Sequence, residues 1–306
     1  MKIARRTFLK QSMIGLGGLL LGCRRQTESQ SAAFWDPYEK TSLGRTGLRL
    51  SRVGWGTGMK GSRRMSNQTR LGKEKFNELA RGCFERGVCW FDAADLYGSH
   101  SYLADALEGI RREEYVLVSK IWLGWGGLPE PERPDADIIV GRFLKELRTD
   151  YIDLVLLHCM AAPDWPDRHE KQMEILDRLK TQGVIRAHGI SCHSLPALQA
   201  AAVHPWVDSI HTRINPFGVQ MDAEPDQVVP VLQEAHRNGK GVIGMKIIGE
   251  GAFRNSPLKR SQSVDFVFNL GCVDSVVVGF ESLQEEEDFA QCVRQTPVRL
   301  PAASSA

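Results

Sequence analysis

The sequence lacks the marks of several protein classes. Its seven cysteines include no pair with the C-x-x-C spacing of a zinc or iron–sulfur site. No apolar run approaches the roughly 18 to 20 residues that a transmembrane helix requires. There is also no basic stripe, because Lys and Arg number 39 against 37 Asp and Glu, and four of the bases fall within the first 22 residues. The slightly acidic remainder argues against nucleic acid as a partner, since neutralising phosphates supplies most of that affinity.

The first 22 residues have the pattern of an export signal. Arg5-Arg6-Thr-Phe-Leu-Lys looks like a twin-arginine motif, and an apolar run follows at residues 13–22. About ten apolar residues are too few to cross a bilayer as a mature helix, so this run is typical of a cleaved signal peptide. We therefore expect residues 1–22 to be read by the twin-arginine translocase during export.

Cys23 directly follows this run. Leu-Leu-Gly-Cys at residues 20–23 resembles a bacterial lipobox, in which the cysteine thiol carries a lipid. The alternative is a signal peptide cut elsewhere, with Cys23 removed or left free. Residues 23–40 are expected to be a tether, so the pattern favours a periplasmic or cell-envelope protein attached to the membrane through lipidated Cys23.

The body of the chain alternates short apolar segments with segments of helical period. This alternation is typical of βα units, and successive apolar residues within a segment indicate parallel strands covered on both faces. Eight strands are predicted, at residues 53–56, 89–93, 116–119, 152–157, 188–191, 209–214, 242–245 and 275–278. No linker interrupts them. We expect one α/β domain over residues 41–306, a (β/α)8 TIM barrel preceded by an N-terminal β-hairpin near residues 43–51.

Helix boundaries are also readable. The pair Asn238-Gly239 predicts the end of a helix, because glycine accepts the left-handed conformation there. Ser282 with Glu285 predicts a capping box at the start of the last helix. Most of the cysteines after Cys23 lie in apolar runs and are expected to be buried thiols.

Four polar residues fall at predicted strand ends, where a barrel gathers its chemistry. Asp92 and Tyr97 follow the second strand, Lys120 ends the third, and His158 ends the fourth. Any one of them alone has a structural explanation: Asp92 with Lys120 could be only a buried ion pair, and Tyr97 only a core aromatic. The complete set of four at one mouth favours a reaction centre.

At these residues the sequence resembles the aldo-keto reductases. The resemblance rests on Leu-Gly-Arg-Thr-Gly-Leu at 43–48, Asp-Ala-Ala-Asp-Leu-Tyr-Gly at 92–98, and Asp-Tyr-Ile-Asp-Leu-Val-Leu-Leu-His at 150–158. It covers nearly all of the chain after Leu43. The resemblance implies an NAD or NADP-dependent oxidoreductase acting on a carbonyl or alcohol substrate, such as an aldehyde, a ketone or a sugar.

The same resemblance implies a role for each residue. Tyr97 would be the general acid, Lys120 would favour the ionised phenol, Asp92 would hold Lys120, and His158 would orient the carbonyl as a neutral donor. A phenol near pKa 10 is a poor acid–base group at neutral pH, so a neighbouring ammonium is expected.

The cofactor residues depart from the family pattern. Ser191 matches a residue that holds the nicotinamide amide, whereas Cys192 stands in the usual Asn position, His211 in the usual Gln position, and Met245 near the usual stacking aromatic. Gly279 and Glu281 lie in the motif for the adenosine end. If Glu281 occupies the position of the usual Lys or Arg, its charge favours NAD over NADP, although a slip of one or two residues would remove this argument.

Trp122 and Trp125 lie in a Gly- and Pro-rich loop after Lys120. They are candidates for stacking on a flat substrate face, and packing of the loop on itself is the simpler alternative.

Two further hypotheses about the function stay open. One is a metal-dependent barrel hydrolase with His158, His193 and His211 as ligands and Lys120 as a carbamylated bridge. The other is an exported binding lipoprotein on a catalytically impaired barrel. If the enzyme is exported with its nucleotide, we expect the cofactor to be bound tightly and to be recycled in place by a second substrate.

Overall fold

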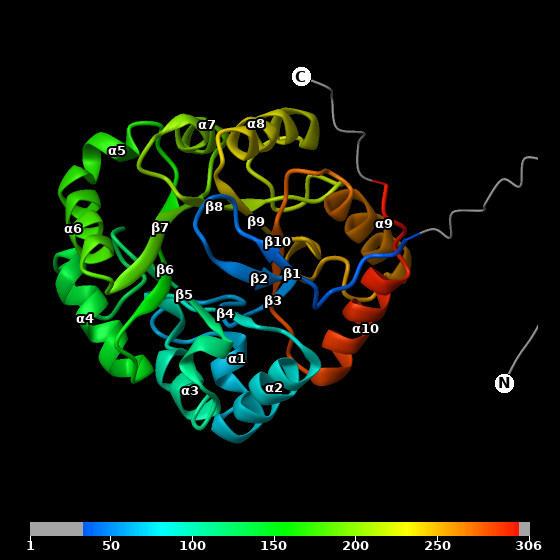
Figure 1. Ribbon diagram of the computed structural model, residues 1–306, viewed down its shortest axis with the longest axis horizontal. Helices are drawn as coiled ribbons and strands as arrows, with labels where there is room; N and C mark the ends of the chain where they lie inside the picture. Colours follow the sequence, from blue (N-terminus) through cyan, green and yellow to red (C-terminus); the bar gives the residue numbers. More distant parts are fainter. Residues whose placement is uncertain (1–32, 300–306) are drawn as a thin grey trace, which may run out of the picture. The chain divides into compact units, whose positions relative to one another are not determined.

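The barrel is closed by eight parallel strands. The computed structural model describes residues 33–299, and its strands close in the order β10-β3-β4-β5-β6-β7-β8-β9, seen end-on in Figure 1. All eight predicted strands are present, several of them longer than expected. Their bounds are β3 Val53–Gly56, β4 Trp90–Asp92, β5 Val116–Ile121, β6 Ile152–Met160, β7 Ile185–Cys192, β8 Ser209–Arg213, β9 Gly241–Met245 and β10 Ser275–Val278.

The helices form a ring outside the strands (Figure 1). Each bears an apolar stripe that packs on the barrel; in α2, for example, Phe76, Leu79, Ala80 and Cys83 are buried. The longer helices are α2 Lys73–Arg86, α3 His100–Ala106, α4 Ala136–Leu147, α6 Glu170–Thr181, α7 Leu195–Val203, α8 Pro225–Arg237, α9 Pro257–Phe268 and α10 Leu283–Arg294. Short turns are α1 Asn67–Arg70, α5 Trp165–Arg168, η1 Asp95–Tyr97, η2 Arg112–Glu114 and η3 Gly249–Gly251.

The predicted N-terminal hairpin is confirmed. Strands β1 Lys40–Ser42 and β2 Arg49–Ser51 pair antiparallel and lie across the end of the barrel where the strands begin (Figure 1). Leu43, Leu48 and Leu50 of the hairpin are buried against the side chains that fill the barrel interior. The hairpin therefore seals one end of the barrel and leaves the opposite end for the site.

Trp90 fills much of the barrel interior. Its indole is fully buried and donates to the Ser51 carbonyl at 3.0 Å. A side chain at Gly54 would begin 1.9 Å from that indole, so the neighbouring strand must carry glycine there.

The predicted helix ends are borne out with one difference. Helix α8 ends at Arg237, and Gly239 follows with φ +78°. At α10 the Ser282 side chain accepts from the Glu285 N–H, but the Glu285 carboxylate accepts from the Glu281 N–H at 2.8 Å instead of from Ser282. Only half of the predicted capping box forms, because Glu285 reaches one residue further back.

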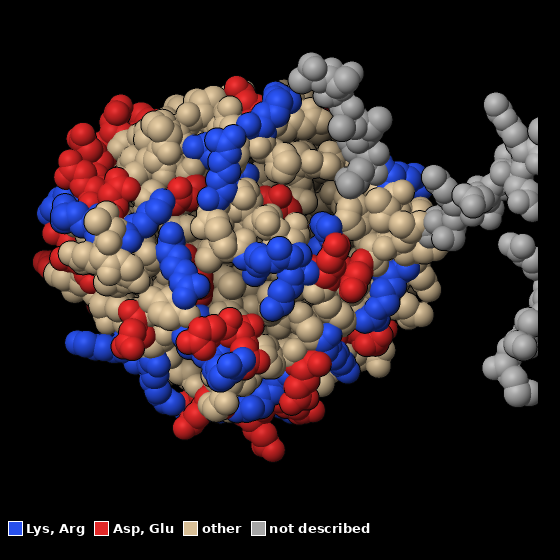
Figure 2. Space-filling view, viewed as in Figure 1, with Lys and Arg blue, Asp and Glu red and all other residues tan. Residues whose placement is uncertain are grey.

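Residues just before the hairpin also pack on the barrel. Trp35 is buried, its N–H donates to the Thr296 carbonyl, and Phe34 pairs with Pro297. The predicted export signal and Cys23 lie outside the described residues. Within residues 33–299 no helix is both long and apolar enough to cross a bilayer. On the face shown in Figure 2, acidic and basic side chains are interspersed.

Candidate active site

The four strand-end residues are brought together at the open end of the barrel. Asp92 ends β4, Tyr97 ends the short turn η1, and Lys120 and His158 lie near the ends of β5 and β6. The Lys120 ammonium donates to Asp92 Oδ1 at 2.5 Å, and the Tyr97 hydroxyl lies 3.3 Å from His158 Nε2. The ammonium also lies 5.1 Å from the centre of the Tyr97 ring. All four side chains therefore form one connected group.

The Asp92–Lys120 pair is buried: burial lowers the pKa of Lys120, and the charge of Asp92 opposes that shift and favours the ammonium. Lys120 also donates to the Ala93 carbonyl at 3.0 Å. Burial alone would raise the pKa of Asp92, but the charge of Lys120 and the nearby His211 lower it below its usual value. His211 Nε2 lies 3.4 Å from Asp92 Oδ1, so the carboxylate has an ammonium on one side and an imidazole on the other.

The environment of Tyr97 differs from our expectation. We predicted that Lys120 would favour the ionised phenol, yet burial and the charge of Asp92 raise the pKa of Tyr97 well above 10. The cause is geometric: the ammonium is held by Asp92 and the Ala93 carbonyl and lies over the face of the ring. Tyr97 therefore holds its proton, as a proton donor must.

His158 is neutral. Burial, together with the charge of Lys120, lowers the pKa of His158 well below its usual value. Trp122 packs edge-on against the imidazole, with ring centres 5.8 Å apart, whereas Trp125 is 96% exposed. Trp122 thus lies beside this group of four residues, and Trp125 does not pack there.

A glycine-rich loop after β3, which the sequence reasoning missed, packs on Tyr97. A side chain at Gly58 or Gly61 would begin within 2.3 Å of the Tyr97 ring. Thr57 in the same loop lies 2.6 Å from the Ser99 hydroxyl and donates to the Asp92 carbonyl. The signal was available in Trp-Gly-Thr-Gly-Met-Lys-Gly, directly after the first barrel strand.

A cavity of about 550 Å³ extends from these residues toward the start of α10. Asp92 and Tyr97 line one end, and Glu281 and Glu285 line the other. Of the six predicted cofactor residues, Met245, Gly279 and Glu281 line this cavity. Other residues that were not predicted also line it, among them Met59, Asn67, Lys246, Arg254 and Arg260.

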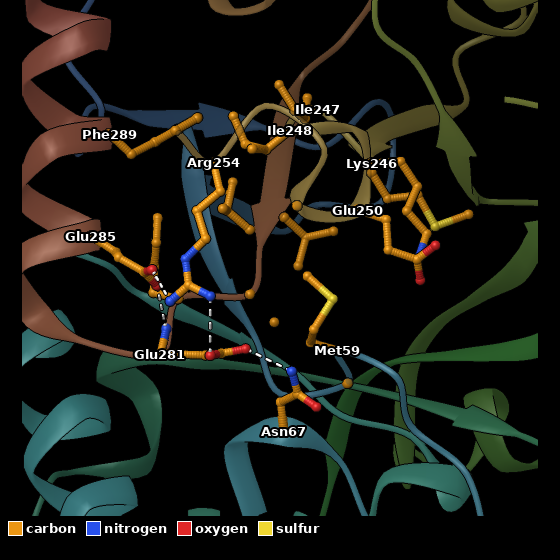
Figure 3. A pocket seen from close by; sticks show the side chains of 18 of the residues that line it. Met59, Asn67, Lys246, Ile247, Ile248, Glu250, Arg254, Glu281, Glu285 and Phe289 are labelled. Atoms are coloured by element: carbon orange, nitrogen blue, oxygen red, sulfur yellow. Dashed lines mark hydrogen bonds and ion pairs between the residues drawn. The ribbon is translucent and has the colours of Figure 1, made fainter. Parts of the chain in front are cut away.

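Glu281 is held from two sides. It accepts from the Asn67 amide at 2.7 Å, and Arg254 lies 3.5 Å away while also pairing with Glu285 (Figure 3). Lys246 and Glu250, paired at 2.9 Å, lie across the cavity from Glu285 (Figure 3). One end of the cavity therefore presents carboxylates partly neutralised by an arginine.

The other three predicted cofactor residues lie away from the cavity wall. Ser191 accepts from the Cys159 N–H at 2.8 Å, Cys192 is fully buried, and His211 lies behind Asp92. Burial raises the pKa of the Cys192 thiol well above its usual value, so it is uncharged. Contact of these three with a cofactor stays a prediction.

Comparison with known proteins assigns the chain to a family. Residues 52–287 match the aldo/keto reductase family. The chain belongs to this family. The Escherichia coli methylglyoxal reductase YeaE is 31% identical over 66% of this chain and 72% of its own length, and the uncharacterized Bacillus subtilis oxidoreductase YqkF is 28% identical over 72% and 69%. An aldo/keto reductase structure from Klebsiella pneumoniae, in complex with NADP and acetate, shares the fold with a TM-score of 0.60 at 18% identity, over 87% of this chain and 92% of that one.

As an aldo/keto reductase, the chain is an NAD(P)-dependent oxidoreductase. The cavity fits such a dinucleotide because Gly56, Gly58 and Gly279 line it with bare backbone. A side chain at Gly56 would begin 2.9 Å from Val277, so only glycine leaves that part of the wall open.

The hypothesis of a metal-dependent hydrolase is not supported. Within residues 33–299 no group of three or more His, Cys, Asp or Glu side chains is arranged to hold a metal ion. His158, His193 and His211 therefore do not form the ligand set that this alternative required.

Proposed function

We propose that this aldo/keto reductase interconverts a small carbonyl compound and its alcohol, with Tyr97 as the general acid and base. The observation that carries the proposal is the Tyr97 hydroxyl, which lies 3.3 Å from a neutral imidazole, over a buried ion pair, at one end of the cavity. NADH or NADPH, when bound, supplies the hydride that reduces the carbonyl carbon.

The side chains of the site would have separate roles in the proton transfer. Tyr97 and His158 form a pair of polar groups that would hold the carbonyl oxygen, and Tyr97 would transfer its proton as alkoxide charge develops. The charges of Asp92 and Lys120 would set the electrostatic environment of the Tyr97 phenol. Lys120 is the only cation in direct contact with the Tyr97 ring among the described residues. Tyr97 holds its proton in the free protein, and the charge of Lys120 would partly offset the effect of Asp92 when the proton leaves.

The cofactor would be held along the cavity. Met245 would face the nicotinamide, Gly279 would allow close backbone approach, and Glu281 would meet the adenosine ribose. The nicotinamide would contact Ser191, Cys192 and His211 only if it binds beyond the residues that line the cavity. Trp122, against His158, is the better candidate of the two tryptophans for substrate contact.

Glu281→Arg should raise affinity for NADP relative to NAD by about tenfold or more, because it replaces like-charge repulsion at the 2′-phosphate with a bidentate donor. Fluorescence titration with both nucleotides measures the ratio. Glu287→Arg, at a half-exposed position of α10, makes the same charge change as a control. An unmoved ratio in Glu281→Arg would remove Glu281 from the adenosine site.

We also propose export by the twin-arginine route, on the sequence pattern alone. Replacing Arg5 and Arg6 together by Lys should leave the protein in the cytoplasm, since the translocase reads the arginine pair and not charge alone. Fractionation of cells measures this, and normal export of the variant would contradict it. Loss of fatty-acid labelling in Cys23→Ser tests lipidation separately.

An exported enzyme needs its nucleotide outside the compartment that makes it. We propose that the nucleotide leaves bound to the folded protein and is recycled by two carbonyl–alcohol pairs in turn. The loop around η3 lines the cavity through Glu250 and Gly251 and is the candidate for slowing release. Protein from the exported fraction, after gel filtration, should carry about one nucleotide per chain. Recovery of empty protein that works only with added nucleotide would contradict retention.

A further inference from the structure

Cys159 differs from the buried thiols that the sequence predicted. It is the one partly exposed residue of β6, and it follows His158 directly. Its φ is +61°, a left-handed conformation that side chains avoid, and the register between β6 and β7 shifts between Leu157 and Met160. This irregularity turns Cys159 toward the end of β7. Its sulfur lies 3.3 Å from His193 Nε2.

The tautomer of His193 is fixed by its other nitrogen. Arg213 Nη2 lies 2.5 Å from His193 Nδ1, and a guanidinium has only donors, so Nδ1 accepts. Burial, with the charges of Arg213 and Lys246, lowers the pKa of His193 to about 3, so the ring is neutral. The single ring hydrogen is therefore on Nε2 and points at the Cys159 sulfur.

The thiol hydrogen must then point elsewhere. Burial raises the pKa of the Cys159 thiol to about 11, so it holds its hydrogen at neutral pH. Because Nε2–H already donates to the sulfur, the S–H can donate either to the Ser191 hydroxyl beside it or to a group outside the protein. Arg213, His193 and Cys159 thus form a chain of donors that starts at a fixed positive charge and ends one residue from His158.

Arg213 has donor capacity left over. Its Nη1 donates to Asp222 Oδ1 at 3.0 Å, but Arg213 Nε is buried without a partner in the described part of the chain. Its neighbour across the β8–β9 register is Met245, which places Lys246 on the same rim. This rim therefore has a polarised thiol and two cations, of which Arg213 is paired with Asp222 and Lys246 with Glu250.

We propose that this rim, formed by Cys159, His193 and Arg213, binds a carboxylate attached to the reacting carbonyl, so that the substrate class is a 2-oxo acid. This rests on the proposed function, with Tyr97 and His158 holding the carbonyl oxygen. Cys159, His193 and Arg213 are all partly exposed at the ends of β6, β7 and β8, on the same side of the barrel as His158. An anion suits a donor chain whose far end is a guanidinium better than a neutral oxygen does.

The test compares pyruvate with methyl pyruvate, which keeps both carbonyl groups and loses the charge. With NADH or NADPH, kcat/KM should favour the acid at least tenfold, mainly through KM. The double variant Arg213→Gln/Asp222→Asn, which avoids a stranded buried carboxylate, should bring the ratio to about one. Cys159→Ala should lower the ratio and Cys159→Ser should restore it. Arg111→Gln, at the opposite end of the barrel, is the control.

Equal or better turnover of the ester by the parent enzyme, or an unchanged ratio in the double variant, would overturn the proposal. Failure of the proposed function is distinguished by titration calorimetry of the nucleotide-bound protein with oxamate and methyl oxamate, which needs no turnover. Preferential binding of oxamate that disappears in the double variant supports the subsite even if neither ester nor acid is reduced. Equal binding of the two probes overturns it.

Discussion

Tyr97→Phe should lower kcat for carbonyl reduction at least about a hundredfold, while nucleotide affinity stays nearly unchanged. The variant removes the hydroxyl that lies 3.3 Å from His158 Nε2 and leaves the ring between the glycine-rich loop and Lys120. The cavity keeps its shape, so binding and catalysis should separate. Stopped-flow reduction and nucleotide titration measure the two effects.

Tyr102→Phe is the matched control for this change. It also deletes a phenolic hydroxyl, from a residue of α3 whose ring packs on Phe76 away from the reaction centre. It should turn over at the parent rate. Turnover of Tyr97→Phe at the rate of Tyr102→Phe would take the acid role away from Tyr97.

Lys120→Met should have the largest effect on stability. The substitution leaves the Asp92 carboxylate buried without its 2.5 Å partner, and breaking one side of a buried pair costs about 3–5 kcal/mol. At about 2–4 °C per kcal/mol for a domain of this size, the melting temperature should fall by roughly 10 °C. Turnover should fall as well, because the phenol loses its neighbouring ammonium.

The double variant Asp92→Asn/Lys120→Met separates the loss of stability from the loss of turnover. It removes both charges, so most of the melting temperature should return while turnover stays low. Calorimetric unfolding and steady-state kinetics measure this. If Lys120→Met alone melts like the parent protein, the pair is not the buried ionised pair described here.

Much of the fold was predictable because it depends on local patterns. Short, mostly apolar runs such as residues 152–157 located the strands, and Asn238-Gly239 located a helix end. The candidate reaction centre followed from these runs, because Asp92, Lys120 and His158 lie where buried strands turn polar. Such positions converge in any closed barrel.

What escaped prediction depends on contacts between distant segments. The packing of Gly58 and Gly61 on Tyr97 joins the loop after β3 to the turn after β4. Arg254 meets Glu281 at one end of the cavity, and no local pattern pairs them. The bulge at Cys159 and the charge balance at Tyr97 are likewise tertiary, since both depend on which neighbours the closed barrel supplies.

The central claim is that this chain transfers a hydride from a nicotinamide to a carbonyl carbon, with Tyr97 supplying the proton. The most direct test incubates the purified protein with NADH and NADPH that carry two deuterium atoms at the nicotinamide C4, using methyl pyruvate and an uncharged aldehyde as substrates. Mass spectrometry of the alcohols should find one deuterium on the former carbonyl carbon, and the rate at which labelled alcohol forms should fall at least about a hundredfold in Tyr97→Phe. Alcohol without deuterium, or no alcohol from either substrate with either nucleotide, would contradict the account.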